Sequence, residues 1–150
     1  ADFVPEVLGK LGVRVLFHKI SQRPGKPMWF GMGPQGQAVF ALPGNPVSTL
    51  VCARQYVVPA LARASGQADA PPDFAVLGQD FTFRPQLTCF LPARLIANAG
   101  GQVLAMPVPT NTSGDFAALS ATDGCVELSR EESSFPAGTV VRLHRWIAAQ

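Results

Sequence analysis

Two short stretches of this 150-residue sequence carry residue types that could bind an anion. The first, QRPGKP at residues 22–27, places Arg23 and Lys26 on a loop that Pro24 and Pro27 stiffen. Cations held this close together repel each other unless an anion lies between them. Taken alone, the loop is equally compatible with a solvated basic turn, because most charged runs in proteins face water.

The second stretch, PGNP at residues 43–46, joins an apolar strand directly to a helical pattern. Such a turn points the N–H groups and the partial positive charge of the helix N-terminus beyond the end of the strand. Gly44 permits close approach of a ligand, Asn45 is a favourable N-cap and Pro46 fits the first helical position. Ser48 adds a hydroxyl and an amide in the first turn. Alone, this motif is better explained as an ordinary strand-to-helix turn, but two anion-directed features in one domain favour an anion site.

The charge distribution agrees with a small anionic ligand. Residues 1–66 carry seven basic and two acidic side chains, a net charge of +5, whereas residues 67–150 carry five basic and eight acidic ones, a net charge of −3. Duplex nucleic acid needs many phosphate contacts, and this sequence has no run of Lys or Arg. We therefore expect small anionic substrates and neither a nucleic-acid nor a membrane partner.

Composition indicates a globular protein with a buried core, since 47% of residues are hydrophobic and 15% are charged. No apolar run approaches the roughly 18 residues that span a bilayer, and the N-terminus lacks the pattern of a signal peptide. We expect a soluble, cytoplasmic protein. Cys52, Cys89 and Cys125 lie far apart among apolar neighbours, which predicts reduced core thiols. With only two histidines beside them, we expect no structural zinc site.

The elements that must position the anion-binding stretches follow from apolar periodicity. Residues 2–11 have the spacing of a short amphipathic helix, with Asp2 as N-cap. Residues 13–20 predict a strand, and residues 28–32 and 37–42 predict two more that form a hairpin.

A longer helix is expected from Pro46 to Gly66, with Pro59 kinking or restarting it because proline lacks an amide donor. Arg54 lies on the polar side of this helix, and we expect it to be solvated.

Composition changes at residues 67–72, which we interpret as a linker between two domains. Residues 1–66 predict an α/β unit, and a helix, three strands and a helix suggest that the chain begins within that domain. Residues 73–150 contain short apolar runs separated by turn signals, the pattern of a small all-β domain in which only residues 113–121 look helical.

The stretches RPGKP, FALPGNPVSTLVC and VVPALARASG together resemble the molybdopterin molybdenumtransferases, the MoeA/gephyrin family, in sequence and in spacing. The resemblance extends through DFVPEVLGKLGVRVLFHK at the start and PVPTNTSGDFAALSATDGCVELS towards the end, so it covers nearly the whole chain. It implies the C-terminal portion of a three-layer α/β molybdopterin-binding domain, followed by a small, barrel-like β domain.

The function implied by the resemblance is the last step of molybdenum cofactor synthesis. Molybdate is inserted into the dithiolene of adenylylated molybdopterin, and a divalent cation, usually magnesium, assists release of AMP. The resemblance also implies a homodimer. Molybdate and the phosphorylated pterin are both anions, in keeping with the two stretches described above.

Site residues are implied by matching the motifs position by position. Asp2 and Lys19 match catalytic positions that serve the phosphate and metal region, with Asp2 as the candidate magnesium ligand. The matches for substrate or molybdate binding are Arg23, Gly25, Lys26, Pro43, Gly44, Asn45, Pro46, Ser48 and Ser113.

The sequence departs from the family in three respects. Arg23 stands where a lysine is usual, which replaces a point cation by a planar fork. Leu87, Cys89 and Pro92 stand where many members have the charged residues of an R-x-E/D-F-x-R pattern. The family's upstream phosphate turn and two N-terminal domains do not occur here, so we expect this chain to form only part of an active enzyme. The alternatives are a non-catalytic anion- or nucleotide-binding module and a scaffold module.

Overall fold

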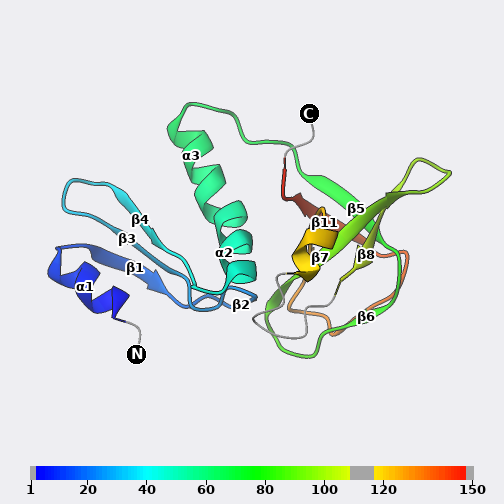
Figure 1. Cartoon of the computed structure of the whole chain (residues 1–150), viewed down its shortest axis with the longest axis horizontal. Helices are drawn as coiled ribbons and strands as arrows, with labels where there is room; N and C mark the ends of the chain where they lie inside the picture. The colour runs from blue at the N-terminus through cyan, green and yellow to red at the C-terminus, as the bar shows by residue number, and fades with distance from the viewer. Residues whose placement is uncertain (1–2, 109–116, 148–150) are drawn as a thin grey trace.

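The computed structural model describes residues 3–108 and 117–147, which form two parts lying side by side (Figure 1). The elements of the first part are α1 (Val4–Lys10), β1 (Arg14–His18), β2 (Gln22–Arg23), β3 (Trp29–Met32), β4 (Ala38–Ala41), α2 (Pro46–Cys52), the π-helical turn η1 (Ala53–Val57) and α3 (Val58–Ala64). Those of the second part are β5 (Asp73–Leu77), β6 (Phe81–Thr82), β7 (Thr88–Ala97), β8 (Val103–Pro107), the 3-10 helix η2 (Ala118–Ala121), β9 (Gly124–Leu128), β10 (Ser134–Phe135) and β11 (Val140–Arg145). The predicted fold class, an α/β part followed by a β-rich barrel-like part, is confirmed.

A three-stranded antiparallel sheet with the order β1-β3-β4 forms the base of the first part. The hairpin predicted between the second and third strands is confirmed, and Trp29 of β3 lies opposite Ala41 of β4. Its turn is closed by a hydrogen bond from Gly33 N to Gln37 O at 2.8 Å. Gly36 adopts a φ of +81° in this turn, a conformation that favours glycine.

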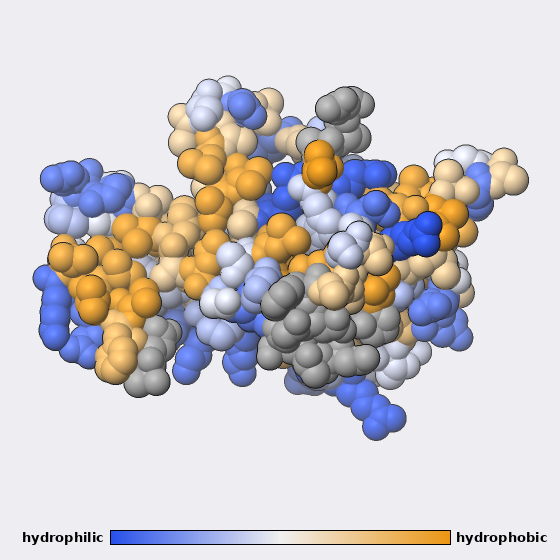
Figure 2. Space-filling view, in the orientation of Figure 1, coloured by the Kyte–Doolittle hydropathy of each residue, from blue (hydrophilic) through white to orange (hydrophobic). Residues whose placement is uncertain are grey.

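The helix predicted at the N-terminus is present as α1, but it begins later than expected. Phe3 occupies the N-cap position and makes no side-chain capping hydrogen bond, and Asp2, the expected N-cap, lies outside the described residues. A proline in the first turn fixes the helical φ where no amide donor is needed, which favours this start. Val7 and Leu11 are 50% and 65% exposed, and Figure 2 shows broad apolar surface over the first part of the chain.

A continuous helical column, composed of α2, η1 and α3, rises from the sheet towards the linker (Figure 1). Its predicted start is confirmed, because Pro46 is the first helical residue and the side chain of Asn45 accepts a hydrogen bond from Ser48 N at 3.0 Å. The predicted restart is also confirmed, since α3 directly follows the π-helical turn and Pro59 is its second residue. Proline has no amide hydrogen to donate, so the ordinary hydrogen-bond ladder stops there.

Five strands of the second part form a closed barrel in the order β7-β8-β5-β11-β9, and pairing of β9 with β7 completes the circle. Closure leaves none of these five strands with an unpaired edge along its whole length. Small and branched apolar side chains fill the barrel, including Ala75, Leu77, Leu91, Ala105, Val126, Leu128 and Leu143.

The two parts are joined by more than the covalent linker. β2, from the first part, pairs in parallel with β7 of the barrel, with Arg23 opposite Cys89. Val51 of the helical column packs against Phe90 and Cys125 of the barrel in a second, smaller apolar cluster. The loop that contains residues 22–27 is therefore attached to the barrel by backbone hydrogen bonds.

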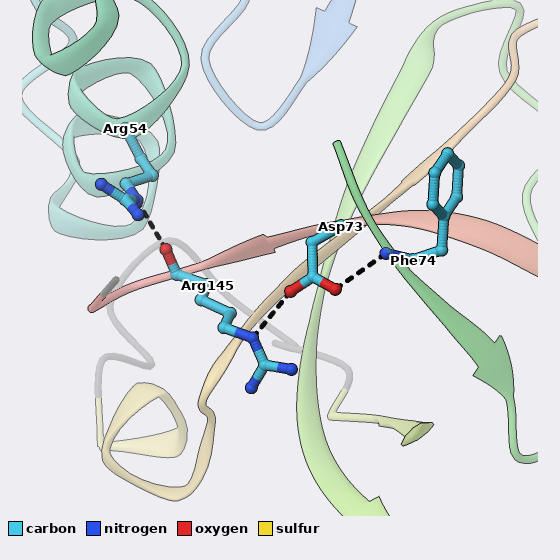
Figure 3. Close-up of polar contacts among 4 residues, drawn as sticks. All are labelled: Arg54, Asp73, Phe74 and Arg145. Atoms are coloured by element: carbon cyan, nitrogen blue, oxygen red, sulfur yellow. Dashed lines mark hydrogen bonds and ion pairs between the residues drawn. The ribbon is translucent and has the colours of Figure 1, made fainter. Parts of the chain in front are cut away.

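Arg54 belongs to this contact between the parts, so the expectation that it is simply solvated is wrong. Its Nε donates a hydrogen bond to the backbone oxygen of Arg145 at the end of β11 (Figure 3). The Nε of Arg145 donates to Asp73 Oδ2 at 2.7 Å, and the other oxygen of that carboxylate accepts from Phe74 N at 2.9 Å. Sequence periodicity gave no sign of this contact because Arg54 and Arg145 are separated by 91 residues.

Cys52, Cys89 and Cys125 are all buried and none forms a disulfide, which confirms the prediction of core thiols. Burial raises the pKa of Cys52 to about 11 and that of Cys89 to about 12. Burial likewise raises the pKa of Cys125, so all three are neutral thiols at pH 7. Within residues 3–108 and 117–147, no helix combines the length and the apolar character needed to cross a membrane.

Candidate functional site

A cavity of about 610 Å³ lies where the loop 22–27, the start of α2 and the barrel meet. Its lining comes from both parts of the chain, with β7 supplying the largest share of the barrel side. Both anion-directed stretches identified in the sequence contribute to it, through Arg23 and Lys26 on one side and Asn45 and Ser48 on the other. The fold therefore brings together two motifs that lie about twenty residues apart.

The loop side of the cavity is cationic. The side chains of Arg23 and Lys26 are exposed and line the cavity, and among the described residues neither has a carboxylate within ion-pair distance. Backbone hydrogen bonds from Ile20 N to Lys26 O at 2.9 Å and from Met28 N to Gly25 O at 3.0 Å close the loop. The loop therefore presents two cations that lack a carboxylate partner in the described part of the chain.

Gly25 is required where the loop approaches the helical column. Its φ is +103°, and a Cβ built there would lie 2.5 Å from Gln22 Nε2 and 2.6 Å from Cys52 Sγ. Any other residue would meet both strain in the backbone and overlap with two buried groups.

The helix side of the cavity offers fewer amide donors than its sequence suggests. The N–H and the hydroxyl of Ser48 both donate to Asn45 Oδ1, at 3.0 and 3.3 Å. Thr49 N donates to Asn45 O at 2.8 Å, and Pro46 has no N–H. Ser48 is only 8% exposed, and its single hydroxyl hydrogen is donated to Asn45 Oδ1, so the hydroxyl can donate to an anion only by leaving that oxygen.

The barrel side of the cavity is apolar, and it was not foreseen. Phe81, Phe83 and Phe90 line it together with Leu87, Cys89, Leu91 and Pro92. Leu87, Cys89 and Pro92, which we expected to stand in place of charged family residues, all line the cavity. In the sequence, the available signal for this side was the spacing of Phe81 and Phe83 in FTF, because side chains two residues apart in an extended segment point to the same face.

Not every candidate residue lies at the cavity. Lys19 is exposed, has a φ of +67° and is not part of the lining. Pro43, Gly44 and Pro46 form the turn behind Asn45 without lining the cavity themselves. Asp2 and Ser113 lie outside the described residues.

The described residues at this cavity do not fit a magnesium ion. Mg²⁺ is usually bound through one or two carboxylates, and the lining contains none. Across residues 3–108 and 117–147, no group of three or more His, Cys, Asp or Glu side chains comes together as a metal site.

Comparison with known proteins gives matches over both parts of the chain. Residues 1–63 match the family model described as "Probable molybdopterin binding domain", and residues 75–146 match "MoeA C-terminal region (domain IV)". The chain is 40% identical to the molybdopterin molybdenumtransferase of Synechocystis sp. over 146 residues, which are 97% of this chain and 35% of that protein. It is 35% identical to the enzyme of the same name from Haemophilus influenzae over 147 residues, 95% of this chain and 36% of that protein.

A solved structure has the same fold. The molybdopterin biosynthesis MoeA protein from Pyrococcus horikosii superposes with a TM-score of 0.79 and 31% sequence identity, over 99% of this chain and 36% of that one. The chain thus spans about a third of the length of these relatives.

Proposed function

Because the chain belongs to the molybdopterin molybdenumtransferase family, we propose that it serves molybdenum cofactor biosynthesis by contributing the oxyanion-binding part of such an enzyme. The reaction proposed for the whole enzyme is insertion of molybdate into adenylylated molybdopterin with release of AMP. Within it, this chain's residues hold molybdate in the cavity between the loop 22–27 and the barrel.

One observation carries the proposal. Arg23 and Lys26 line a cavity of about 610 Å³ whose lining has no carboxylate to neutralise them. Charge-assisted hydrogen bonds from such cations to an oxyanion are about twice as strong as neutral ones. The apolar barrel side restricts water on the opposite side, which strengthens the attraction between a bound dianion and these cations.

The remaining roles are proposed from the resemblance to the family. Ser48 and Ser113 add hydrogen bonds to molybdate, whereas Lys19 and Asp2 serve the phosphate and metal region. Gly25, Pro43, Gly44, Asn45 and Pro46 shape the loop and the turn. Magnesium, with Asp2 as its ligand, a homodimer and a cytoplasmic location remain predictions from the family and the sequence.

The test is calorimetric titration of the folded protein with molybdate, with sulfate as the competing dianion. We expect the double substitution Arg23→Ala, Lys26→Ala to weaken molybdate binding by at least roughly a hundredfold, since two charge-assisted contacts are lost. The matched control is Arg63→Ala, Arg130→Ala, which removes the same total charge from two exposed pairs away from the cavity. This control should retain the affinity of the unsubstituted protein.

The outcomes separate the rival functions. Equal affinity for molybdate and sulfate would favour a generic anion- or nucleotide-binding module. Binding of a protein partner that survives the double substitution, without oxyanion binding, would favour a scaffold module. Absence of molybdate binding in a protein shown by circular dichroism to be folded would refute the oxyanion site proposed for this chain.

A further inference from the structure

Gln22 is a polar residue that the fold buries almost completely, at 3% exposure, although it lies within a loop of exposed cations. A buried amide is costly unless its hydrogen-bonding groups are satisfied. Its Nε2 donates to Pro24 O at 2.9 Å and lies 3.7 Å from Cys52 Sγ, and its Oε1 accepts a hydrogen bond from the hydroxyl of Tyr56. The amide therefore bridges the loop and the helical column.

The loop end of this bridge lies between the two cations. Pro24 is adjacent to Arg23 and two residues from Lys26, so fixing its carbonyl restrains the backbone that carries both side chains. Gly25 packs directly against Gln22 Nε2, leaving no room for a Cβ. Cys52 Sγ lies 3.8 Å from Gly25 O, which adds a second contact between the column and the loop.

The helix end of the bridge lies on the side of the column that faces the cavity. Ser48, Cys52 and Tyr56 follow each other at intervals of four residues. In an uninterrupted α-helix, eight residues give a rotation of about 80° away from Ser48, because each turn contains about 3.6 residues. The π-helical turn at Ala53–Val57 is wider and reduces this rotation, and Tyr56 reaches Gln22.

We propose that Gln22 is a positioning residue for oxyanion binding, and that Tyr56 holds its amide in the orientation that fixes the Arg23–Lys26 loop. The inference rests on the function proposed above, in which that loop binds molybdate. Exposed cations on an unrestrained loop lose conformational entropy when an anion orders them, which weakens binding. Because Gln22 already restrains the loop in the folded protein, less conformational entropy is lost when the anion binds.

The decisive variant is Tyr56→Phe, which removes one hydroxyl and leaves the ring. We expect molybdate affinity to fall roughly tenfold, because Gln22 Oε1 loses its donor and the amide is free to reorient. Gln22→Leu should cause a similar loss. The double variant should bind about as well as the weaker single variant, since both changes break the same bridge.

The matched control is Thr122→Val. It removes a hydroxyl at the end of η2 that accepts a hydrogen bond from Trp146 Nε1 at 2.8 Å and donates one to Leu119 O at 2.7 Å, and neither Thr122 nor Trp146 lines the cavity. We expect a comparable fall in melting temperature and no change in molybdate affinity. A loss of affinity in this control equal to that in Tyr56→Phe would overturn the proposal, because the effect would then be one of general stability.

A second measurement separates this proposal from the proposed function. Amide hydrogen exchange at Ile20 and Met28, whose N–H groups donate to Lys26 O and Gly25 O, reports how firmly the loop is held. Tyr56→Phe should speed this exchange and Thr122→Val should not. Unchanged exchange in Tyr56→Phe refutes the positioning role, whether or not the unsubstituted protein binds molybdate. Absence of binding with faster exchange refutes only the oxyanion function.

Discussion

Substitution of Gly25 by alanine gives the sharpest test of how the loop meets the helical column. The new Cβ would lie 2.5 Å from Gln22 Nε2 and 2.6 Å from Cys52 Sγ, on a residue with a φ of +103°. The unfavourable backbone conformation costs about 1–3 kcal/mol, and overpacking costs about 1–3 kcal/mol more. We expect the free energy of unfolding to fall by roughly 3 kcal/mol after partial relaxation of the two side chains.

Gly36→Ala is the matched control, because Gly36 has a φ of +81° but nothing within 4 Å of the new Cβ. It meets only the backbone cost, about 1–2 kcal/mol. At about 2–4 °C per kcal/mol for a chain of this size, melting temperatures should fall by roughly 6–12 °C for Gly25→Ala and by about 2–8 °C for the control. Thermal denaturation followed by circular dichroism measures both. Equal losses in the two variants would refute the close packing of Gly25 against the column.

Two further predictions concern the contact between the parts and the barrel. Phe90→Ala should lower the free energy of unfolding, measured by urea denaturation, by about 3 kcal/mol, because the Phe90 ring is 5% exposed and packs between the two parts. The control Phe74→Ala should lower it by less than about 1 kcal/mol, because Phe74 is 53% exposed. The hydrogen bond from His144 lowers the pKa of Glu127, partly opposed by burial, so this pair stabilises the fold above the usual pKa of the carboxyl group. This stabilisation should be lost as pH falls through the lowered pKa of Glu127. In Glu127→Gln, the free energy of unfolding should therefore depend less on pH in the acid range. An unchanged pH dependence would contradict a stabilising role for the Glu127–His144 pair.

Local signals in the sequence predicted the local structure well. The strand pairing β3–β4, the cap at Asn45, the helix start at Pro46 and the restart at Pro59 each depend on a few adjacent residues, and each is present. The start of α1 at Val4 is two residues later than expected, because helix ends are the part of a helix that a sequence pattern defines least well.

Contacts distant in sequence were the ones that could not be predicted. The Gln22–Tyr56 hydrogen bond spans 34 residues and that between Arg54 and Arg145 spans 91, and neither residue type nor periodicity marks such partners. The sequence marked Arg23 and Lys26 as anion-binding, but it could not indicate that a buried amide beside them connects their loop to a helix.

The position of the cavity follows from how the loop 22–27 is supported. Its β2 segment is hydrogen-bonded to β7 of the barrel, while the side chain of Gln22 is bonded to the helical column. One short segment is therefore fixed to both parts, and the cavity lies beside this segment, between the two parts.

This arrangement separates the cationic side of the cavity, which the first part supplies, from the apolar side, which the barrel supplies. For the oxyanion proposed to bind there, Arg23 and Lys26 supply cations from one side of the cavity, and the barrel supplies the apolar side opposite them. A change at the contact between the parts, such as Phe90→Ala, would then weaken anion binding as well as stability, because it moves one side of the cavity relative to the other.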